Sequence, residues 1–159
     1  MQELPLINYV SMIHLFSVAA WLGVVMTELV IEVYPYKNRG LYLSTIHFHY
    51  WIDLLVELPL VLLLLGSGIV LIFLNASLDL LHILKIVTGL IPVVACFSGI
   101  YIVIRRANAL KAGKKEEDLW GGSRNIVIVV LIASPFFGLS FGLGLWLARS
   151  RLLEMVTGG

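Results

Sequence analysis

Charged residues and cysteines are scarce in this sequence. Asp, Glu, Lys and Arg make up 13% of its 159 residues, whereas hydrophobic residues make up 60%. A typical soluble domain carries roughly 25% charged residues, so this composition excludes the ordinary soluble class and places the chain in a lipid bilayer. The one cysteine, Cys96, cannot form a disulfide within the chain.

The sequence also lacks the motifs of several enzyme and carrier classes. Its GSG and GLG segments lie within apolar runs instead of between a strand and a helix, so it has no phosphate-binding glycine loop. No nucleophile is paired with a base. The absence of Cys-x-x-Cys and the scattered methionines argue against a dedicated copper carrier.

Four long apolar runs dominate what is present. They cover residues 6–33, 51–74, 80–104 and 125–148. Each run is long enough to cross about 30 Å of hydrocarbon as a helix of roughly 20 residues. The amino-terminal segment MQELPLINYV has no cationic leader, so we keep the first run as a span. The sequence therefore predicts an all-α integral membrane four-helix bundle, with residues 1–159 as a single four-span domain.

The distribution of positive charge predicts the orientation. The connections after the first and third spans carry Lys and Arg, whereas the connection after the second carries only Asp79. Because basic loops stay in the cytoplasm, we expect a multi-pass protein of the cell inner membrane with both termini on the non-cytoplasmic side, even though Arg149 and Arg151 add positive charge there. The segment RRANALKAGKKEEDLWGGSR is expected to be a solvated loop, and its acidic residues offset its basic ones, so no nucleic-acid partner is predicted.

Three nitrogen-bearing side chains fall at similar depth near the non-cytoplasmic surface. His14 lies roughly 12 Å deep in the first span at 1.5 Å per residue, and the third span places His82 near the same surface with Lys85 one turn deeper. A b-type haem takes two such ligands from facing helices, so His14 with His82 and His14 with Lys85 are both possible pairs. Trp21, on the His14 face, would pack in the core or line a planar cofactor. The alternative is that His14 bonds a backbone carbonyl across the bundle while Lys85 extends to the headgroups.

A second set of ionisable residues lies near the cytoplasmic side. It comprises Glu28 and Glu32 on the first span and His49, Asp53 and Glu57 on the second. The four-residue intervals place each group on one helical face, and each ionisable group costs about 2.5 to 3.5 kcal/mol inside a membrane unless it has a partner or a task. The balancing charge comes from basic residues at the same surface or from a second, divalent metal shared by the set. The candidate basic residues are Arg105, Arg106 and Arg124. A third role for this set of residues is a proton path, in which Glu28, Glu57 and His49 pass protons toward a redox centre.

Three segments resemble a known family. IHLFSVAAWLGVVMTELVIEVY, with a tryptophan seven residues after a histidine, is similar to the first span of the J-type membrane protoporphyrinogen oxidases and the related copper-resistance D-type membrane domains. LLHILKIVTGLIPVVACFSGIYIVIRRANAL resembles that family's helix with a histidine and a lysine close together, and GSRNIVIVVLIASP lies where its fourth span begins.

The resemblance implies a small membrane protein that binds b-type haem, with His14 and Lys85 at the matching positions. The spacing here is His-x-x-Lys where the family has His-x-Lys, so His82 and Lys85 both remain candidates for the second ligand. The segment HFHYWIDLLVE lies outside the family pattern, so a haem protein with an electron partner other than a porphyrinogen is an equal expectation.

Three functions are consistent with these sites. The first is a membrane b-type cytochrome that transfers electrons or oxidises a quinol or porphyrinogen, with an unidentified redox partner. The second is a membrane protein that handles a divalent metal through the cytoplasmic-side set. The third is a noncatalytic membrane subunit whose fourth span packs onto a second copy or a larger complex through small residues. These small residues are Ser134, Gly138 and Gly142, with Ser140 and Gly144 offset by two.

Overall fold

The computed structural model describes residues 6–34, 41–74 and 79–157, and these residues are almost entirely helical. The elements are α1 (Leu6–Val33), α2 (Tyr42–Ile52), the π-helical turn η3 (Asp53–Glu57), α3 (Leu58–Leu74), α4 (Leu80–Lys111) and α5 (Glu116–Thr157). The described residues contain no strand. The all-α prediction is confirmed.

Four helical stretches are long and apolar enough to cross a membrane. They are Leu6–Val33, Tyr42–Leu74, Leu80–Lys111 and Asp118–Leu147, the second of which comprises α2, η3 and α3. Large apolar side chains on all four are exposed, among them Phe16, Phe73, Tyr101 and Leu131. Such a surface suits lipid acyl chains better than water, so the molecule is a multi-pass integral membrane four-helix bundle.

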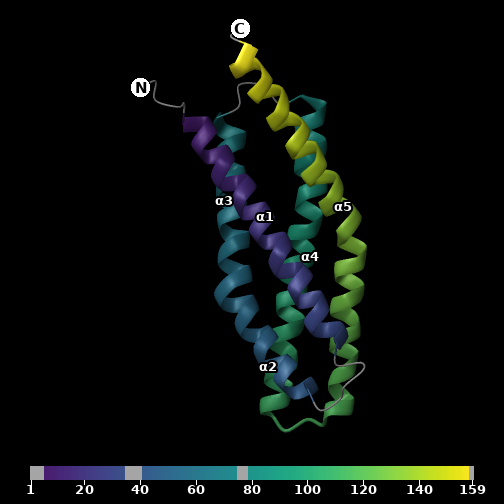
Figure 1. Cartoon of the computed structure of the whole chain (residues 1–159). Helices are drawn as coiled ribbons and strands as arrows, with labels where there is room; N and C mark the ends of the chain where they lie inside the picture. Colours follow the sequence, from purple (N-terminus) through teal and green to yellow (C-terminus); the bar gives the residue numbers. More distant parts are fainter. Residues whose placement is uncertain (1–5, 35–40, 75–78, 158–159) are drawn as a thin grey trace.

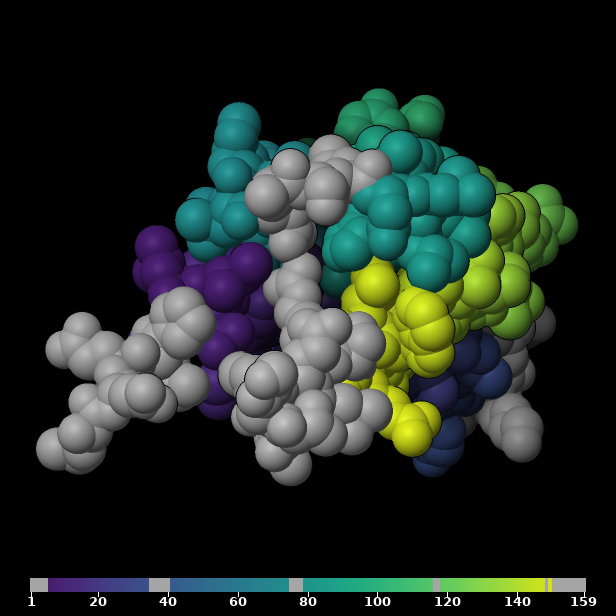
Figure 2. Space-filling view, turned by 90° about the horizontal axis from the view of Figure 1, so that it is seen from above, coloured from purple at the N-terminus to yellow at the C-terminus, as the bar shows by residue number. Residues whose placement is uncertain are grey.

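The helices pack in two antiparallel pairs. α1 lies against α3, and α4 lies against α5 along most of its length (Figure 1). The start of α1 and the end of α5 lie at the same end of the bundle, which we call the outer end, and the turn between α4 and α5 lies at the inner end (Figure 1). Viewed from the outer end, the start of α4 (teal) lies against the coloured outer part of α5 (yellow), and the start of α1 (purple) is also visible (Figure 2).

The helices extend beyond the predicted spans at the inner end. The segment expected to be a solvated loop is mostly helical, because α4 continues to Lys111 and α5 begins at Glu116. Its residues include many strong helix formers, and the chain reverses at Gly113, whose φ of 79° is accessible to glycine without strain. The second span begins at Tyr42 instead of residue 51, because the polar residues before 51 continue the helix and are partly buried in it.

The π-helical turn ends two residues before Pro59. In η3 the Leu58 N–H bonds the Asp53 carbonyl, five residues earlier. Pro59 has no N–H, and in a regular α-helix its ring would crowd the carbonyl four residues earlier. The wider turn relieves this conflict. α4 and α5 continue through Pro92 and Pro135.

The buried apolar residues form two clusters. The central core comprises Trp21, Val61, Leu64, Val93, Cys96 and Ile100. The inner core comprises Tyr42, Ile46, Ala107 and Leu119, and the Tyr42 ring stacks on Trp120 with 4.3 Å between centroids. Tight packing thus joins the helices in the middle and at the inner end.

Candidate functional site

A cavity of about 590 Å³ occupies the outer half of the bundle. α1, α3, α4 and α5 all contribute to its walls, which are mainly apolar. Its polar lining residues are Asn8, Ser11, His14, His82, Lys85 and Ser140. Its volume lies within the range of about 300 to 1,000 Å³ that is usual for ligand and cofactor sites, and a few polar groups in an apolar wall are typical of them. We call this space the outer cavity.

The tautomer of His14 follows from its hydrogen bonds. Its Nδ1 lies 3.1 Å from the Leu64 carbonyl oxygen and 3.0 Å from Ser67 Oγ. The Ser67 hydroxyl itself donates to the Leu63 carbonyl at 2.7 Å, so both partners of Nδ1 are positioned to accept. Nδ1 therefore carries the proton, and Nε2 keeps the lone pair that a metal requires. A bond from His14 to a backbone carbonyl across the bundle, which the sequence offered as the alternative to haem ligation, is present.

Lys85 lines the outer cavity with His14. It is half-buried, and its Cε lies 3.3 Å from the point where a Cβ on Gly144 would be. The Lys85 side chain therefore extends toward α5. His14 on α1 and Lys85 on α4 thus line one cavity.

His82 lines the same cavity but belongs to the start of α4. Asp79 is the N-cap, and its Oδ1 accepts from the His82 backbone N–H at 2.9 Å and lies 2.6 Å from His82 Nδ1. The backbone N–H, followed by the imidazole, lowers the pKa of the Asp79 carboxyl. This capping contact fixes the His82 ring beside the helix start.

Trp21 joins the outer cavity to the buried polar region below it. Its indole lines the cavity, is 3% exposed and meets Phe137 edge-on at 5.4 Å between centroids. Its Nε1–H donates to Glu57 Oε1 at 2.9 Å. The sequence suggested core packing or cofactor lining for Trp21. The side chain packs in the central core and also lines the outer cavity, and it makes a hydrogen bond that the sequence did not predict.

The second polar region lies toward the inner end, where buried ionisable groups from α1, α2, η3 and α4 meet. We call this region the inner polar cluster. It comprises Glu28, Glu32, His49, Asp53, Glu57 and Arg106, each less than 9% exposed. All five residues that the sequence placed in the cytoplasmic-side set are members.

Arg106 supplies the positive charge at one side of the cluster. Its Nη1 donates to Glu32 Oε2 at 2.9 Å while Nη2 pairs with Oε1 of the same carboxylate. Nη1 also donates to Ser123 Oγ at 2.6 Å, and Ser123 Oγ donates to the Tyr42 hydroxyl at 3.2 Å. The other two candidate arginines, Arg105 and Arg124, are exposed.

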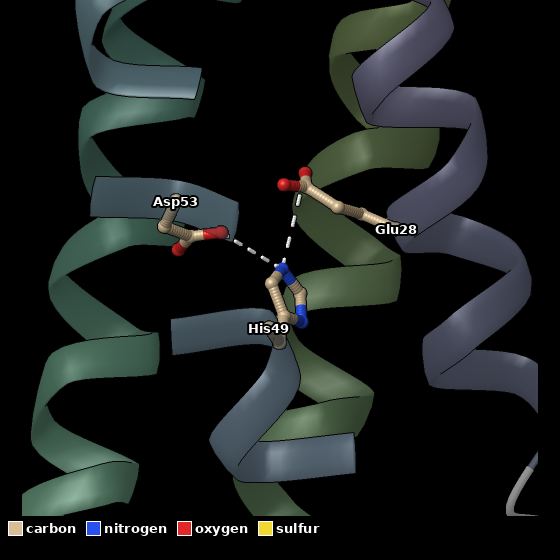
Figure 3. Close-up of side chains that lie close together, drawn as sticks. All are labelled: Glu28, His49 and Asp53. Carbon is tan, nitrogen blue, oxygen red and sulfur yellow. Dashed lines mark ion pairs between the residues drawn. The ribbon is translucent and has the colours of Figure 1, made fainter. Parts of the chain in front are cut away.

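His49 stands at the centre of the cluster. Its Nδ1–H donates to Glu32 Oε1 at 2.5 Å, and its Nε2 lies 3.2 Å from Asp53 Oδ1 and 3.8 Å from Glu28 Oε2. Figure 3 shows the Nε2 edge of the imidazole turned toward both carboxyl groups. One ligand atom from each of Glu28, His49 and Asp53 lies within 4.8 Å of the other two.

The carboxyl groups of the cluster outnumber its cationic side chains. The carboxyl groups belong to Glu28, Glu32, Asp53 and Glu57. Among the described residues of the cluster, the basic side chains are those of Arg106 and His49. Unpaired ions are costly in a low-dielectric interior, so the surplus carboxylates require protons or a metal cation. Among the described residues, Glu28 Oε1 and Asp53 Oδ1 have no hydrogen-bond partner.

Ser123 and Tyr42 are the members of the surrounding network that sequence reasoning missed. Both side chains carry a single hydroxyl, so their types alone do not distinguish them from other polar residues near a helix end. The signal that was available is Gly121–Gly122 immediately before Ser123, since small residues allow α5 to approach α4 closely.

Comparison with protein-family models, curated proteins and solved structures finds no match to this chain. The resemblance to the J-type oxidases and D-type domains therefore rests on the quoted segments alone.

Proposed function

We propose that this chain is a membrane b-type haem protein that transfers electrons, and that His14 would be one of the residues that hold the haem iron in the outer cavity. The observation that carries the proposal is the hydrogen bond from His14 Nδ1–H to the Leu64 carbonyl. A histidine ligand is usually oriented by such a bond from its other ring nitrogen. His14 therefore offers a neutral, fixed Nε2 at the wall of an apolar cavity of about 590 Å³.

The outer cavity suits a flat, mainly apolar cofactor. Gly68 lets the His14 ring lie close to α3, since a Cβ there would be 3.2 Å from His14 Cε1. Trp21 and Phe137 add aromatic surface to the wall. Bound haem would supply one-electron redox chemistry, and the chain would supply the ligands, the orientation and the exclusion of water.

Lys85 is the proposed second ligand. It lines the cavity from α4, whereas His14 lines it from α1, and a lysine amine can serve as an iron ligand when it is neutral. His82 is held by Asp79 through Nδ1 at the start of α4. The deeper position of Lys85 favours it over His82.

The proposed electron donor is a quinol or a porphyrinogen, both of which release protons on oxidation. Glu57 is joined to the cavity wall by its bond from Trp21. His49 and Glu28 lie further toward the inner end. Without a bound metal ion, these groups would form the proposed proton path from the cavity toward the inner end.

An optical spectrum tests the haem assignment. The protein is produced with added 5-aminolaevulinate and haemin, purified in detergent, and recorded in oxidised and reduced states. We expect a Soret band in the wild type and in His47→Ala, whose exposed ring bonds Trp51, and its loss in His14→Ala. Lys85→Met should keep the protein folded and change the ligand-sensitive bands, whereas His82→Ala should not. A wild-type protein without a Soret band, or an unchanged band in His14→Ala, contradicts the proposal.

The proposal places both termini on the non-cytoplasmic side of the inner membrane, because the basic connection between α4 and α5 lies at the inner end. A fusion of alkaline phosphatase to the carboxyl terminus should be active, and a fusion of green fluorescent protein there should be dark. The opposite pair of results would reverse the orientation.

A homodimer or larger complex would use the exposed face of α5. Ser134, Gly138 and Gly142 are exposed, whereas Ser140 donates to the Lys85 carbonyl at 3.2 Å and Gly144 contacts the Lys85 side chain. The small residues of α5 thus lie on two faces. Ser140 and Gly144 face α4, and the exposed face with Ser134, Gly138 and Gly142 could pack against another chain. Gly138→Leu should dissociate a dimer in light-scattering measurements in detergent, and Gly99→Leu on α4 is the control.

A further inference from the structure

We propose that the inner polar cluster contains a binding site for one divalent transition metal ion, held by Glu28, His49 Nε2 and Asp53. This site is separate from the outer cavity, and the inference does not depend on haem binding. A divalent ion with mixed nitrogen and oxygen ligands and no thiolate belongs to the class of Zn²⁺, Mn²⁺ and Fe²⁺.

The ligand spacing fits a single ion. Two ligands that each lie about 2.1 Å from a tetrahedral metal are separated by roughly 3.4 Å. His49 Nε2 lies 3.2 Å from Asp53 Oδ1 and 3.8 Å from Glu28 Oε2. The three side chains come from α1, α2 and η3 and converge on one point (Figure 3).

Two buried carboxylate oxygens at this point lack a hydrogen-bond partner. Asp53 Oδ1 lies at an ion-pair distance of 3.2 Å from His49 Nε2, and it has no hydrogen-bond partner among the described residues. Glu28 Oε2 lies 3.8 Å from the same nitrogen, and Glu28 Oε1, the other oxygen of this carboxylate, has no hydrogen-bond partner among these residues. The Glu28 and Asp53 side chains are only 9% and 2% exposed. Buried carboxylate oxygens nearly always have a partner, and ligands that share one ion have this arrangement of close, unbonded donor atoms.

The remaining contacts prepare His49 to act as a ligand. Glu32 Oε1 accepts the Nδ1–H of His49 at 2.5 Å, which leaves the lone pair on Nε2. Arg106 in turn fixes both oxygens of Glu32. A carboxylate that orients a histidine in this way is the usual outer partner of a metal-bound histidine. Glu32 is therefore a positioning residue for the site, and its oxygens are engaged elsewhere.

The site also accounts for much of the charge surplus. A divalent ion neutralises Glu28 and Asp53, while Arg106 neutralises Glu32. Glu57 is outside the group of converging ligand atoms and accepts from Trp21 instead. The ion would also link α1 to the helix formed by α2, η3 and α3.

The test uses the full chain in detergent, stripped with a chelator and then exposed to Zn²⁺, Mn²⁺ or Co²⁺. Metal retained after desalting is counted by mass spectrometry, and Co²⁺ reports its ligands through its visible absorption. We expect about one ion per chain in the wild type and in His47→Ala, and none in His49→Ala. Asp53→Asn should weaken binding, whereas Asp118→Asn at an exposed position should not. Glu32→Gln should lower the affinity about 10- to 100-fold and change the Co²⁺ spectrum.

Circular dichroism and gel filtration identify the variants that remain folded. If His49→Ala fails to fold, Asp53→Asn and Glu32→Gln carry the comparison. Absence of stoichiometric uptake by the folded wild type overturns the proposal, as does equal uptake by the wild type and Asp53→Asn. Because His14→Ala leaves these ligands intact, loss of its Soret band with retained metal separates this site from the haem assignment.

Discussion

The guanidinium of Arg106 on α4 forms a two-pronged ion pair with the carboxylate of Glu32 on α1, inside the inner polar cluster. The pair joins helices that are distant in the sequence, and both side chains are almost completely buried. Removal of one partner leaves the other as an uncompensated buried charge.

Arg106→Gln should therefore lower the free energy of unfolding by about 3 to 5 kcal/mol. Arg105→Gln, at the neighbouring exposed position, should change it little. Denaturation in mixed micelles, followed by circular dichroism, gives both values. The double variant Glu32→Gln with Arg106→Gln should recover part of the loss, and equal stability of the two single arginine variants would contradict this account.

Ser67→Ala should weaken haem binding about tenfold, because Ser67 Oγ is one of the two groups that hold the His14 ring. The Leu64 carbonyl still fixes the tautomer, so the effect should be smaller than that of His14→Ala. Haem titration followed at the Soret band measures the affinity. Ser98→Ala is the matched control, since its hydroxyl makes a similar bond to Val94 on an exposed face; a loss of affinity there would point to a general effect of removing a hydroxyl.

Trp21→Phe should lower the free energy of unfolding by about 1 to 3 kcal/mol, because it leaves the buried Glu57 carboxyl without its indole donor. Trp146→Phe is the comparison, since Trp146 is 56% exposed. Unfolding in mixed micelles reports both variants. Should they lose the same stability, the indole bond to Glu57 contributes nothing measurable.

Gly144→Leu should fill the outer cavity from α5 and reduce haem content severalfold while the helices remain folded. A Cβ added at this position would lie 3.3 Å from Lys85 Cε, and Gly144 lines the cavity. Gly99→Leu is the control, since a Cβ there meets nothing within 4 Å. The measured quantity is the ratio of Soret to protein absorbance; retention of full haem by Gly144→Leu would place the haem elsewhere.

The sequence predicted those features that depend on local periodicity. Apolar runs of membrane-spanning length predict the four helices, and the four-residue intervals place His49, Asp53 and Glu57 on a common face. The same logic identified Glu28 and Glu32 as the facing pair. These predictions need only the geometry of single helices.

Features that depend on the rotation of one helix against another were not predictable in this way. Arg105 and Arg106 are adjacent in the sequence, and only the rotation of α4 decides that Arg106 meets Glu32. The bond from Trp21 to Glu57 likewise depends on how α1 lies against the second span. The turn η3 depends on Pro59 and on how the turn packs, so periodicity alone predicts a regular α-helix over Asp53–Glu57.

The indole of Trp21 has one side in the outer cavity and its N–H on an acid of the inner polar cluster. A ligand in the outer cavity that displaces the Trp21 indole must also change its hydrogen bond to Glu57. By thermodynamic linkage, a change in Glu57 then affects binding of that ligand by the same free energy. Binding in the outer cavity and the state of the inner polar cluster are therefore coupled through the Trp21 side chain.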